Sequence, residues 1–331
     1  MCIQLGAADR QVAGSIVSDA QLHMRQVVKR HVEIVEVGPR DGLQHETVTF
    51  SLEAKQEFVG RMVAAGIRRL EVASFVNPKR VPQMADADAL MKSLPTVAGV
   101  TYIGLVMNRR GFDRAVAAGC AEIGMVVVAS NTFNQRNQGV TTEQSLITWR
   151  EIARAAHAAG VRPQVTVSAA FGCPFEGEVP VERVIDLAKR VAQEGPSEIA
   201  FADTIGVAVP SQVSALIEDA RNAVPGVSLR CHFHNTRNTG IANAYAALTA
   251  GVSTLDASLG GIGGCPFAPA ATGNIPTEDL VYMLQRMGID TGVNLDQLLD
   301  SSRWMQTQLG RTVPGLVVKA GGFPRPAGAA Q

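Results

Sequence analysis

The sequence predicts an α/β fold, a (β/α)8 TIM barrel with an additional C-terminal helix. Short apolar runs rich in β-branched residues recur along the chain, and helix-like stretches lie between them. Several of those stretches end in glycine. Strands alternating with helices indicate a parallel sheet. Eight such units within about 250 residues favour a closed barrel, with a doubly wound open sheet as the alternative.

Eight strands and the clearest helices follow from this pattern, in chain order. The expected strands are 32–37, 69–74, 101–106, 122–130, 164–170, 198–203, 228–234 and 253–258. The clearest helices between strands are 51–66, 142–160 and 181–195, and a further helix, 292–310, follows the barrel. Glycine adopts the left-handed conformation that ends a helix without strain. We therefore expect left-handed helix caps at Gly66, Gly119, Gly160, Gly195 and Gly251.

The chain divides into three parts. Residues 1–30 form an N-terminal extension, 31–311 the barrel with its added helix, and 312–331 a flexible tail. The extension lacks the cationic start and the apolar core of a secretory signal. No stretch approaches the ~20 apolar residues of a membrane span.

The composition limits the classes of binding partner and the cellular compartment that we expect for the protein. The 331 residues include 30 basic and 30 acidic side chains, so the net charge is zero. Neither nucleic acid nor a membrane is expected as the main partner. Five widely spaced cysteines argue against a disulfide framework and for a reducing, cytoplasmic location. Barrels of this kind often pair, so we expect a homodimer.

Polar residues gather where the predicted strands end. In a barrel these ends and the loops after them form one mouth, where the chemistry takes place. The residues are Arg40, Asp41, Gln44 and Glu46 after the first strand, Glu71 in the second, Asp203 in the sixth, His232 and His234 in the seventh, and Cys265, Asn274 and Glu278 after the eighth.

The stretch "LRCHFHNT" (229–236) predicts a metal site. Side chains alternate along a strand, so Arg230, His232 and His234 share one face. The two histidines, with Asp41 and an amide oxygen, would form a mixed oxygen and nitrogen site that suits Mg²⁺ or Mn²⁺, while zinc remains open. A polar strand end facing water is the alternative for the histidines, and a plain turn is the alternative for Asp41.

Cys265 lies in the glycine-rich loop "GGIGGCPF". A thiol there is expected to be accessible and able to donate or accept a proton, although a small loop residue without a role is the alternative. The loop follows the eighth strand, so "GGIGG" does not match a dinucleotide-binding motif, which opens the first βα unit. Cys120 and Cys231 are expected in the core.

Several motifs together resemble 3-hydroxy-3-methylglutaryl-CoA lyase, of the metal-dependent DRE-TIM lyase superfamily. The resemblance covers about residues 32–311, and its most specific part is the block from the cysteine loop onward. The motifs are "VEVGPRDGLQHE", "SFVNPKRVPQM", "GCPFEG", "FADTIGVAVP", "HFHNT" and "GGIGGCPFAPAATGNIPTEDLVYML".

This resemblance implies cleavage of 3-hydroxy-3-methylglutaryl-CoA to acetyl-CoA and acetoacetate. It implies that Arg40 stabilises the enolate and that Cys265 is the acid, whereas His232 and Asp203 both remain candidates for the base. The divalent metal would be held by Asp41, His232, His234 and Asn274. Glu71, Asp203 and Glu278 resemble acids that support the site or handle protons. Contacts with substrate or CoA are assigned to Gln44, Asn131, Gln164, Glu278 and Arg311.

The sequence departs from the family pattern where the acyl group would be recognised. Gln164 stands where an arginine is usual, and Asn131 where an acid is common. Asn235 replaces the usual aspartate after the second histidine. A lyase for another branched 3-hydroxyacyl-CoA, such as citramalyl-CoA, is therefore an alternative. A condensing synthase and a barrel that only binds acyl-CoA or metal are two more.

Overall fold

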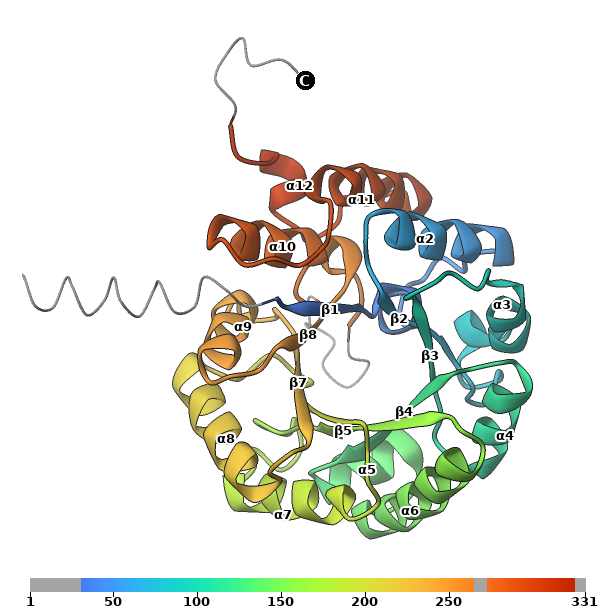
Figure 1. Cartoon of the computed structure of the whole chain (residues 1–331), viewed down its shortest axis with the longest axis vertical. Helices are drawn as coiled ribbons and strands as arrows, with labels where there is room; N and C mark the ends of the chain where they lie inside the picture. The colour runs from blue at the N-terminus through green and yellow to red at the C-terminus, as the bar shows by residue number, and fades with distance from the viewer. Residues whose placement is uncertain (1–30, 265–272, 325–331) are drawn as a thin grey trace, which may run out of the picture.

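The computed structural model describes residues 31–264 and 273–324. Eight strands close into a barrel in sequence order, each parallel to the next, and β8 pairs with β1 (Figure 1). The expected (β/α)8 barrel is thereby confirmed. The strands are β1 (Glu33–Glu36), β2 (Arg69–Ser74), β3 (Thr101–Leu105), β4 (Glu122–Val128), β5 (Arg162–Ser168), β6 (Glu198–Asp203), β7 (Ser228–Phe233) and β8 (Thr254–Ala257).

Helices surround the ring of strands (Figure 1). Several begin at a side chain that accepts a first-turn N–H; Thr141, for example, forms a capping box with Gln144. The five glycines expected as left-handed helix caps all have positive φ, which confirms that prediction. The helices are α2 (Leu52–Ala64), α3 (Ala87–Ser93), α4 (Arg109–Ala117), α5 (Asn131–Gln138), α6 (Thr142–Ala158), α7 (Val181–Ala192), α8 (Pro210–Ala223), α9 (Gly240–Thr249), α10 (Thr277–Arg286), α11 (Leu295–Leu309) and α12 (Val317–Ala320).

The two faces of β7 differ as the alternation predicts. Cys231 and Phe233 are buried in the apolar core. Arg230 and His232 instead contact polar side chains of other strands. The inner face of β7 is therefore polar and carries charge.

A chain of ion pairs runs through the barrel, and we call it the axial network. His232 contacts Asp256 at 3.1 Å, and the Asp256 carboxylate lies 3.4 Å from Nε of Arg230. Arg230 contacts Glu198 at 3.3 Å, and Glu198 contacts Arg69 at 3.1 Å. The network ends at the N-terminal side of the strands, where Arg69 also pairs with Glu33 and Glu122. These groups compensate one another's charge inside the barrel.

The C-terminal part packs on the barrel further than expected. The expected added helix is α11, which contacts α2 and α10. A flexible tail was expected from residue 312, but Val313 and Val318 are buried, and Asp279 accepts N–H bonds from Leu316 and Val317. Residues 313–320 are therefore fixed by apolar burial and by capping. The predicted extension 1–30 and the last residues, 325–331, lie outside the described residues.

Within the described part of the chain, no helix combines the length and the apolar character needed to cross a membrane. The described cysteines, Cys120, Cys173 and Cys231, are buried and free. Cys120 and Cys231 lie in the core, as expected.

Candidate active site

Three potential metal ligands meet at the C-terminal mouth of the barrel. Asp41 lies in the π-helical turn η1 (Gly38–Gly42) after β1, His232 in β7, and His234 just after it. One ligand atom from each lies within 4.8 Å of the others. The His232 and His234 rings lie 5.1 Å apart between centroids. The structure thus brings together three of the residues predicted to bind metal.

Asn274 completes the group that the sequence predicts. Its Nδ2 donates to Oδ2 of Asp41 at 2.9 Å and to the Ile262 carbonyl at 3.1 Å. Its Oδ1 is buried and has no hydrogen-bond partner among residues 31–264 and 273–324, and the same holds for Nδ1 of His234. Buried polar atoms are usually paired, so an unpaired oxygen beside a carboxylate and two imidazoles is compatible with a divalent cation.

The electrostatics of this group suit ligation. Burial would raise the pKa of Asp41, but Arg40 and the two histidines outweigh it and hold that pKa well below its usual range. Burial, together with the nearby His232, lowers the pKa of His234 to about 3. At neutral pH the site therefore offers a charged carboxylate and a neutral His234 imidazole, the forms that bind metal.

Arg40 stands beside the potential ligands. It donates to Oδ1 of Asp41 at 2.7 Å and to Oε1 of Glu71 on β2. Burial disfavours its charge, but Glu71 and Asp41 raise its pKa above the ordinary value. Two acids therefore fix a permanently charged guanidinium at the mouth.

Asp256 on β8 holds His232. Its Oδ2 lies 3.1 Å from Nδ1 of His232, an arrangement that leaves Nε2 as the other functional nitrogen. Burial opposes a charge on His232, but the hydrogen bond and charge of Asp256 outweigh it and raise the pKa of His232. Our reading of the sequence missed Asp256. The signal was an acid on the inner face near the end of the eighth strand.

A cavity of about 590 Å³ opens at this mouth. Its lining includes predicted site residues together with His45 and Arg230, to which the sequence reading gave no role. Gly264, just before Cys265, also lines it. The predicted site residues in the lining are Arg40, Asp41, Gln44, Glu71, His232 and His234.

Cys265 lies outside the described residues, but the chain on both sides of its segment is described. Gly263 has a φ of 116°, and a Cβ there would lie 2.7 Å from Nδ2 of Asn274. Gly273 has a φ of 99°, and a Cβ there would lie 2.5 Å from the Gly261 carbonyl. Only glycine fits such close approaches at positive φ.

Two acids that the sequence predicts in the site, Asp203 and Glu278, accept hydrogen bonds from nearby loops and do not line the cavity. Both carboxylate oxygens of Asp203 accept N–H bonds, from Val207 at 2.9 Å and Ala208 at 3.0 Å. Glu278 accepts from the Gly260 N–H and from the Ser302 hydroxyl, both at 2.9 Å. Each carboxylate therefore fixes a loop at the mouth.

Three predicted substrate or CoA contacts also lie outside the cavity lining. Asn131 accepts a hydrogen bond from the Thr142 N–H at 3.1 Å. Gln164 is buried in β5 and accepts a hydrogen bond from Arg230. Arg311 pairs with both oxygens of Glu46, at 2.6 and 2.8 Å.

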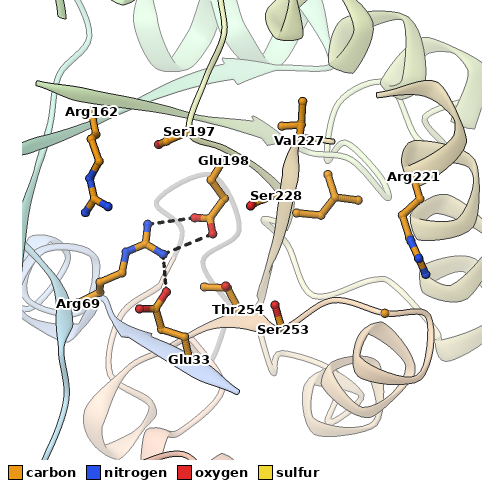
Figure 2. Close-up of a pocket in the computed structure, with 12 residues that line it drawn as sticks. Glu33, Arg69, Arg162, Ser197, Glu198, Arg221, Val227, Ser228, Ser253 and Thr254 are labelled. Atoms are coloured by element: carbon orange, nitrogen blue, oxygen red, sulfur yellow. Dashed lines mark hydrogen bonds and ion pairs between the residues drawn. The ribbon is translucent and has the colours of Figure 1, made fainter. Parts of the chain in front are cut away.

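A second pocket, of about 390 Å³, lies at the opposite end of the barrel (Figure 2). Arg69 lies at its floor between Glu33 and Glu198, and dashed lines in Figure 2 mark these pairs. The active sites of such barrels lie at the C-terminal ends of the strands, which is the end opposite this pocket. We therefore place the active site at the mouth with Asp41 and His232.

The chain forms a closed (β/α)8 barrel, and a carboxylate, two imidazoles and an arginine lie together at its C-terminal mouth. This arrangement is typical of enzymes with this fold. The family model described as HMGL-like matches residues 31–305. The chain therefore belongs to the HMGL-like family.

Curated relatives cover nearly the whole barrel. The chain is 45% identical over 300 residues to (R)-citramalyl-CoA lyase of Chloroflexus aurantiacus, covering 88% of this chain and 95% of the relative. It is 40% identical over 292 residues to hydroxymethylglutaryl-CoA lyase of Pseudomonas mevalonii, covering 87% and 97%. The family resemblance read from the sequence is confirmed, and the chain is a carbon–carbon lyase acting on an acyl-CoA.

Solved structures agree with the fold. The HMG-CoA lyase of Bacillus subtilis superposes with a TM-score of 0.86 at 38% identity, covering 88% of this chain and 98% of that one. An HMG-CoA lyase of Acinetobacter baumannii, in complex with coenzyme A and 3-methylmalate, also has a TM-score of 0.86, at 37% identity, covering 89% and 98%.

Proposed function

We propose that the protein is a divalent-metal-dependent lyase that cleaves 3-hydroxy-3-methylglutaryl-CoA to acetyl-CoA and acetoacetate. The observation that carries the proposal is the buried cluster of Asp41, His232 and His234 beside Arg40, in a chain of an acyl-CoA lyase family. The reaction breaks a carbon–carbon bond next to a tertiary alcohol. It moves one proton from the hydroxyl to a base and returns one to the new thioester enolate carbon.

Asp41, His232, His234 and Asn274 would hold the metal, Mg²⁺ or Mn²⁺. When bound, the ion would polarise substrate oxygens and make the tertiary hydroxyl more acidic. Carboxylate, imidazole and amide oxygen are donors that these ions accept.

Arg40 would stabilise the enolate oxygen. Its guanidinium keeps its charge through the reaction, and Asp41 and Glu71 fix its direction. A preorganised charge that faces a developing negative charge lowers the barrier without reorganising at the moment of reaction.

Of the two candidate bases, the contacts favour His232 over Asp203, on the condition that Nε2 of His232 is not bound to the metal. Both Asp203 oxygens already accept backbone N–H bonds, whereas Asp256 orients His232 from the far side of its ring. Nε2 of His232 cannot bind metal and accept a proton at the same time. The affinity of a His232→Ala variant for Mn²⁺ separates the two roles, because only a ligand role weakens it.

Cys265 would protonate the enolate carbon. The residue before it in the sequence, Gly264, lines the cavity, which supports this role. We expect Cys265→Ala to lose at least about 100-fold in kcat, the scale of a general acid's contribution, while Mn²⁺ affinity stays unchanged. Normal turnover by this variant would remove the assigned role. A lack of turnover in the wild type and in the variant alike, with acyl-CoA still bound by both, would instead favour the alternative of a barrel that only binds acyl-CoA or metal.

Citramalyl-CoA is the second candidate substrate. The relative with 45% identity is a citramalyl-CoA lyase, whereas the hydroxymethylglutaryl-CoA lyases named above are 40% and 38% identical. The two substrates differ by one methylene between the carboxylate and the carbinol carbon. Such a difference is worth only about 1–3 kcal/mol in discrimination, so few residues could decide it.

The test is acetyl-CoA release by chelator-treated protein, with each substrate and with or without Mg²⁺ or Mn²⁺. Metal-dependent release from the first substrate supports the proposal. Release from citramalyl-CoA alone keeps the mechanism and moves the substrate. If neither is cleaved, condensation of acetyl-CoA with a 2-oxo acid tests the synthase alternative.

A further inference from the structure

One wall of the active-site cavity is the loop after β2, which we call the 77–83 loop. Asn77, Arg80, Val81 and Gln83 all line the cavity. The Asn77 side chain accepts the Lys79 N–H at 3.0 Å, and its carbonyl accepts the Arg80 N–H at 2.9 Å. Gln83 donates to the Glu46 carbonyl at 2.9 Å. The backbone of this loop is therefore held in place on the wall.

Arginines that line the cavity differ in how their charge is balanced. Arg40 pairs with Asp41 and Glu71. Arg230 lies within 3.4 Å of Asp256 and 3.3 Å of Glu198. Arg80 is exposed and has no ion pair or side-chain hydrogen bond within residues 31–264 and 273–324.

The charge next to Arg80 is of the same sign. Lys79 is exposed as well, and no acidic partner for it occurs in the described part of the chain. The 77–83 loop thus presents positive charge at the open side of a cavity whose inner part contains the catalytic cluster. An acyl-CoA carries its reacting thioester at one end and its phosphates at the other, so it needs cations at a distance from the reacting atoms.

Arg311, which the sequence reading assigned to CoA, is already engaged. Glu46 takes its Nη2 through both carboxylate oxygens, at 2.6 and 2.8 Å. A guanidinium in such a pair has less capacity for an added phosphate. Among the arginines of residues 31–264 and 273–324 that line the cavity, Arg80 is the one free to form that contact.

We propose that Arg80, with Lys79 beside it, binds a phosphate group of coenzyme A. The proposal deepens the acyl-CoA lyase function proposed above and rests on it for the identity of the ligand. Arginine is suited to the role because its planar fork can donate two parallel hydrogen bonds to phosphate oxygens.

Calorimetry of wild type, Arg80→Ala and Arg80→Glu with coenzyme A and with pantetheine, which has no phosphate, tests this directly. We expect coenzyme A affinity to fall about tenfold in the alanine variant and further in the glutamate variant, with pantetheine affinity unchanged. Equal loss for both ligands, or no loss for coenzyme A, would overturn the proposal.

The matched control is Arg68→Ala. Arg68 is an exposed arginine at the other end of β2, and its guanidinium donates to the Val63 carbonyl. The Arg68→Ala variant should bind coenzyme A with the same affinity as the wild type. A loss equal to that of Arg80→Ala would mean that net charge alone is responsible, and would also count against the site.

Kinetics separate this proposal from the lyase proposal. In Arg80→Ala, KM for the cleaved acyl-CoA should rise about tenfold while kcat stays near the wild-type value. An N-acetylcysteamine thioester of the same acid should show no difference between the two proteins. If the wild type cleaves no acyl-CoA, the lyase proposal fails, yet the calorimetric comparison still decides whether Arg80 binds phosphate.

Discussion

At the residue scale, the contact between Asp256 and His232 determines which ring nitrogen of His232 is available for chemistry. Oδ2 of Asp256 lies 3.1 Å from Nδ1 of His232, and Arg230 lies 3.4 Å from the other carboxylate oxygen. A carboxylate in this position fixes both the tautomer and the direction of the ring. His232 can then present Nε2 to a metal or to a proton.

We predict that Asp256→Asn lowers the affinity for Mn²⁺ and the kcat by about 10- to 100-fold each. The reason is that the amide no longer fixes the Nδ1–H tautomer. Titration calorimetry with Mn²⁺ measures the first effect independently of turnover.

Asp290→Asn is the control for this prediction. Asp290 contacts Nδ1 of His31 at 3.2 Å, so the pair is chemically the same, but its carboxylate is 77% exposed, against 7% for Asp256. The Asp290→Asn variant should bind Mn²⁺ with the same affinity as the wild type. Wild-type Mn²⁺ affinity in Asp256→Asn would show that the contact does not position His232.

Some residue-scale features follow from sequence and others do not. The alternation of side chains along a strand places His232 and His234 on one face. Asp41 is expected near them because the C-terminal ends of all strands meet at one mouth of the barrel. The partners of Asp203 and Arg311 could not be read in this way. They depend on a loop backbone and on Glu46, whose positions only the folded chain fixes.

At the scale of elements, Glu36 joins the start of the barrel to its end. Its Oε1 accepts the N–H groups of Gly38, at 2.8 Å, and Leu259, at 2.9 Å. Its Oε2 accepts from the Thr277 hydroxyl at 2.6 Å. One buried carboxyl therefore fastens η1, which carries Asp41, to the segment that leads to Gly263.

Glu36 makes the stability of this junction depend on pH. Burial raises its pKa from 4.5 to about 7, despite its hydrogen bonds. The folded state therefore holds this proton more tightly than the unfolded state. Its contribution to the free energy of unfolding is present below pH 4.5 and is lost as pH rises to about 7.

We predict that Glu36→Gln gains stability relative to the wild type across that window, by up to about 3 kcal/mol. Glutamine cannot ionise, so it escapes the cost of burying a charge. Urea unfolding at a series of pH values checks the prediction, with exposed Glu218→Gln as the control. A pH-independent difference between Glu36→Gln and wild type would contradict it.

Most elements could be predicted because their signals are local. The apolar runs and the glycine caps mark strands and helix ends directly. The packing of 313–320 could not be predicted, because Val313 and Val318 are buried by parts of the fold that are distant in sequence. A tail rich in glycine and proline gives no sign of such a surface.

For the whole molecule, closure of the barrel creates the axial network. Arg69 meets Glu33, Glu122 and Glu198, which come from three other strands. The sequence indicates the barrel but not these pairs, because they depend on the register in which β1 and β8 close the ring.

We predict that Arg69→Met lowers the free energy of unfolding by about 3–5 kcal/mol. The change leaves buried carboxylates without their shared cation. Urea unfolding followed by circular dichroism measures it. Arg303→Met, which removes an exposed pair with Asp300, should cost less than about 1 kcal/mol. Equal small effects in both would show that the network is not needed for stability.

The homodimer stays a prediction, and analytical ultracentrifugation tests it directly. A single sedimenting species with the mass of one chain would contradict it.

The hydrogen bond between Arg230 and Gln164 limits how this barrel can diverge. A guanidinium from β7 occupies the position beside residue 164, and the carboxylates of Glu198 and Asp256 are matched to it. Arginine introduced at 164 would set two like charges together, so it could be accepted only with a simultaneous loss at 230. Arginine would then enter position 164 only through paired replacements on two strands, and the single exchange would destabilise the barrel where the coupled exchange would not.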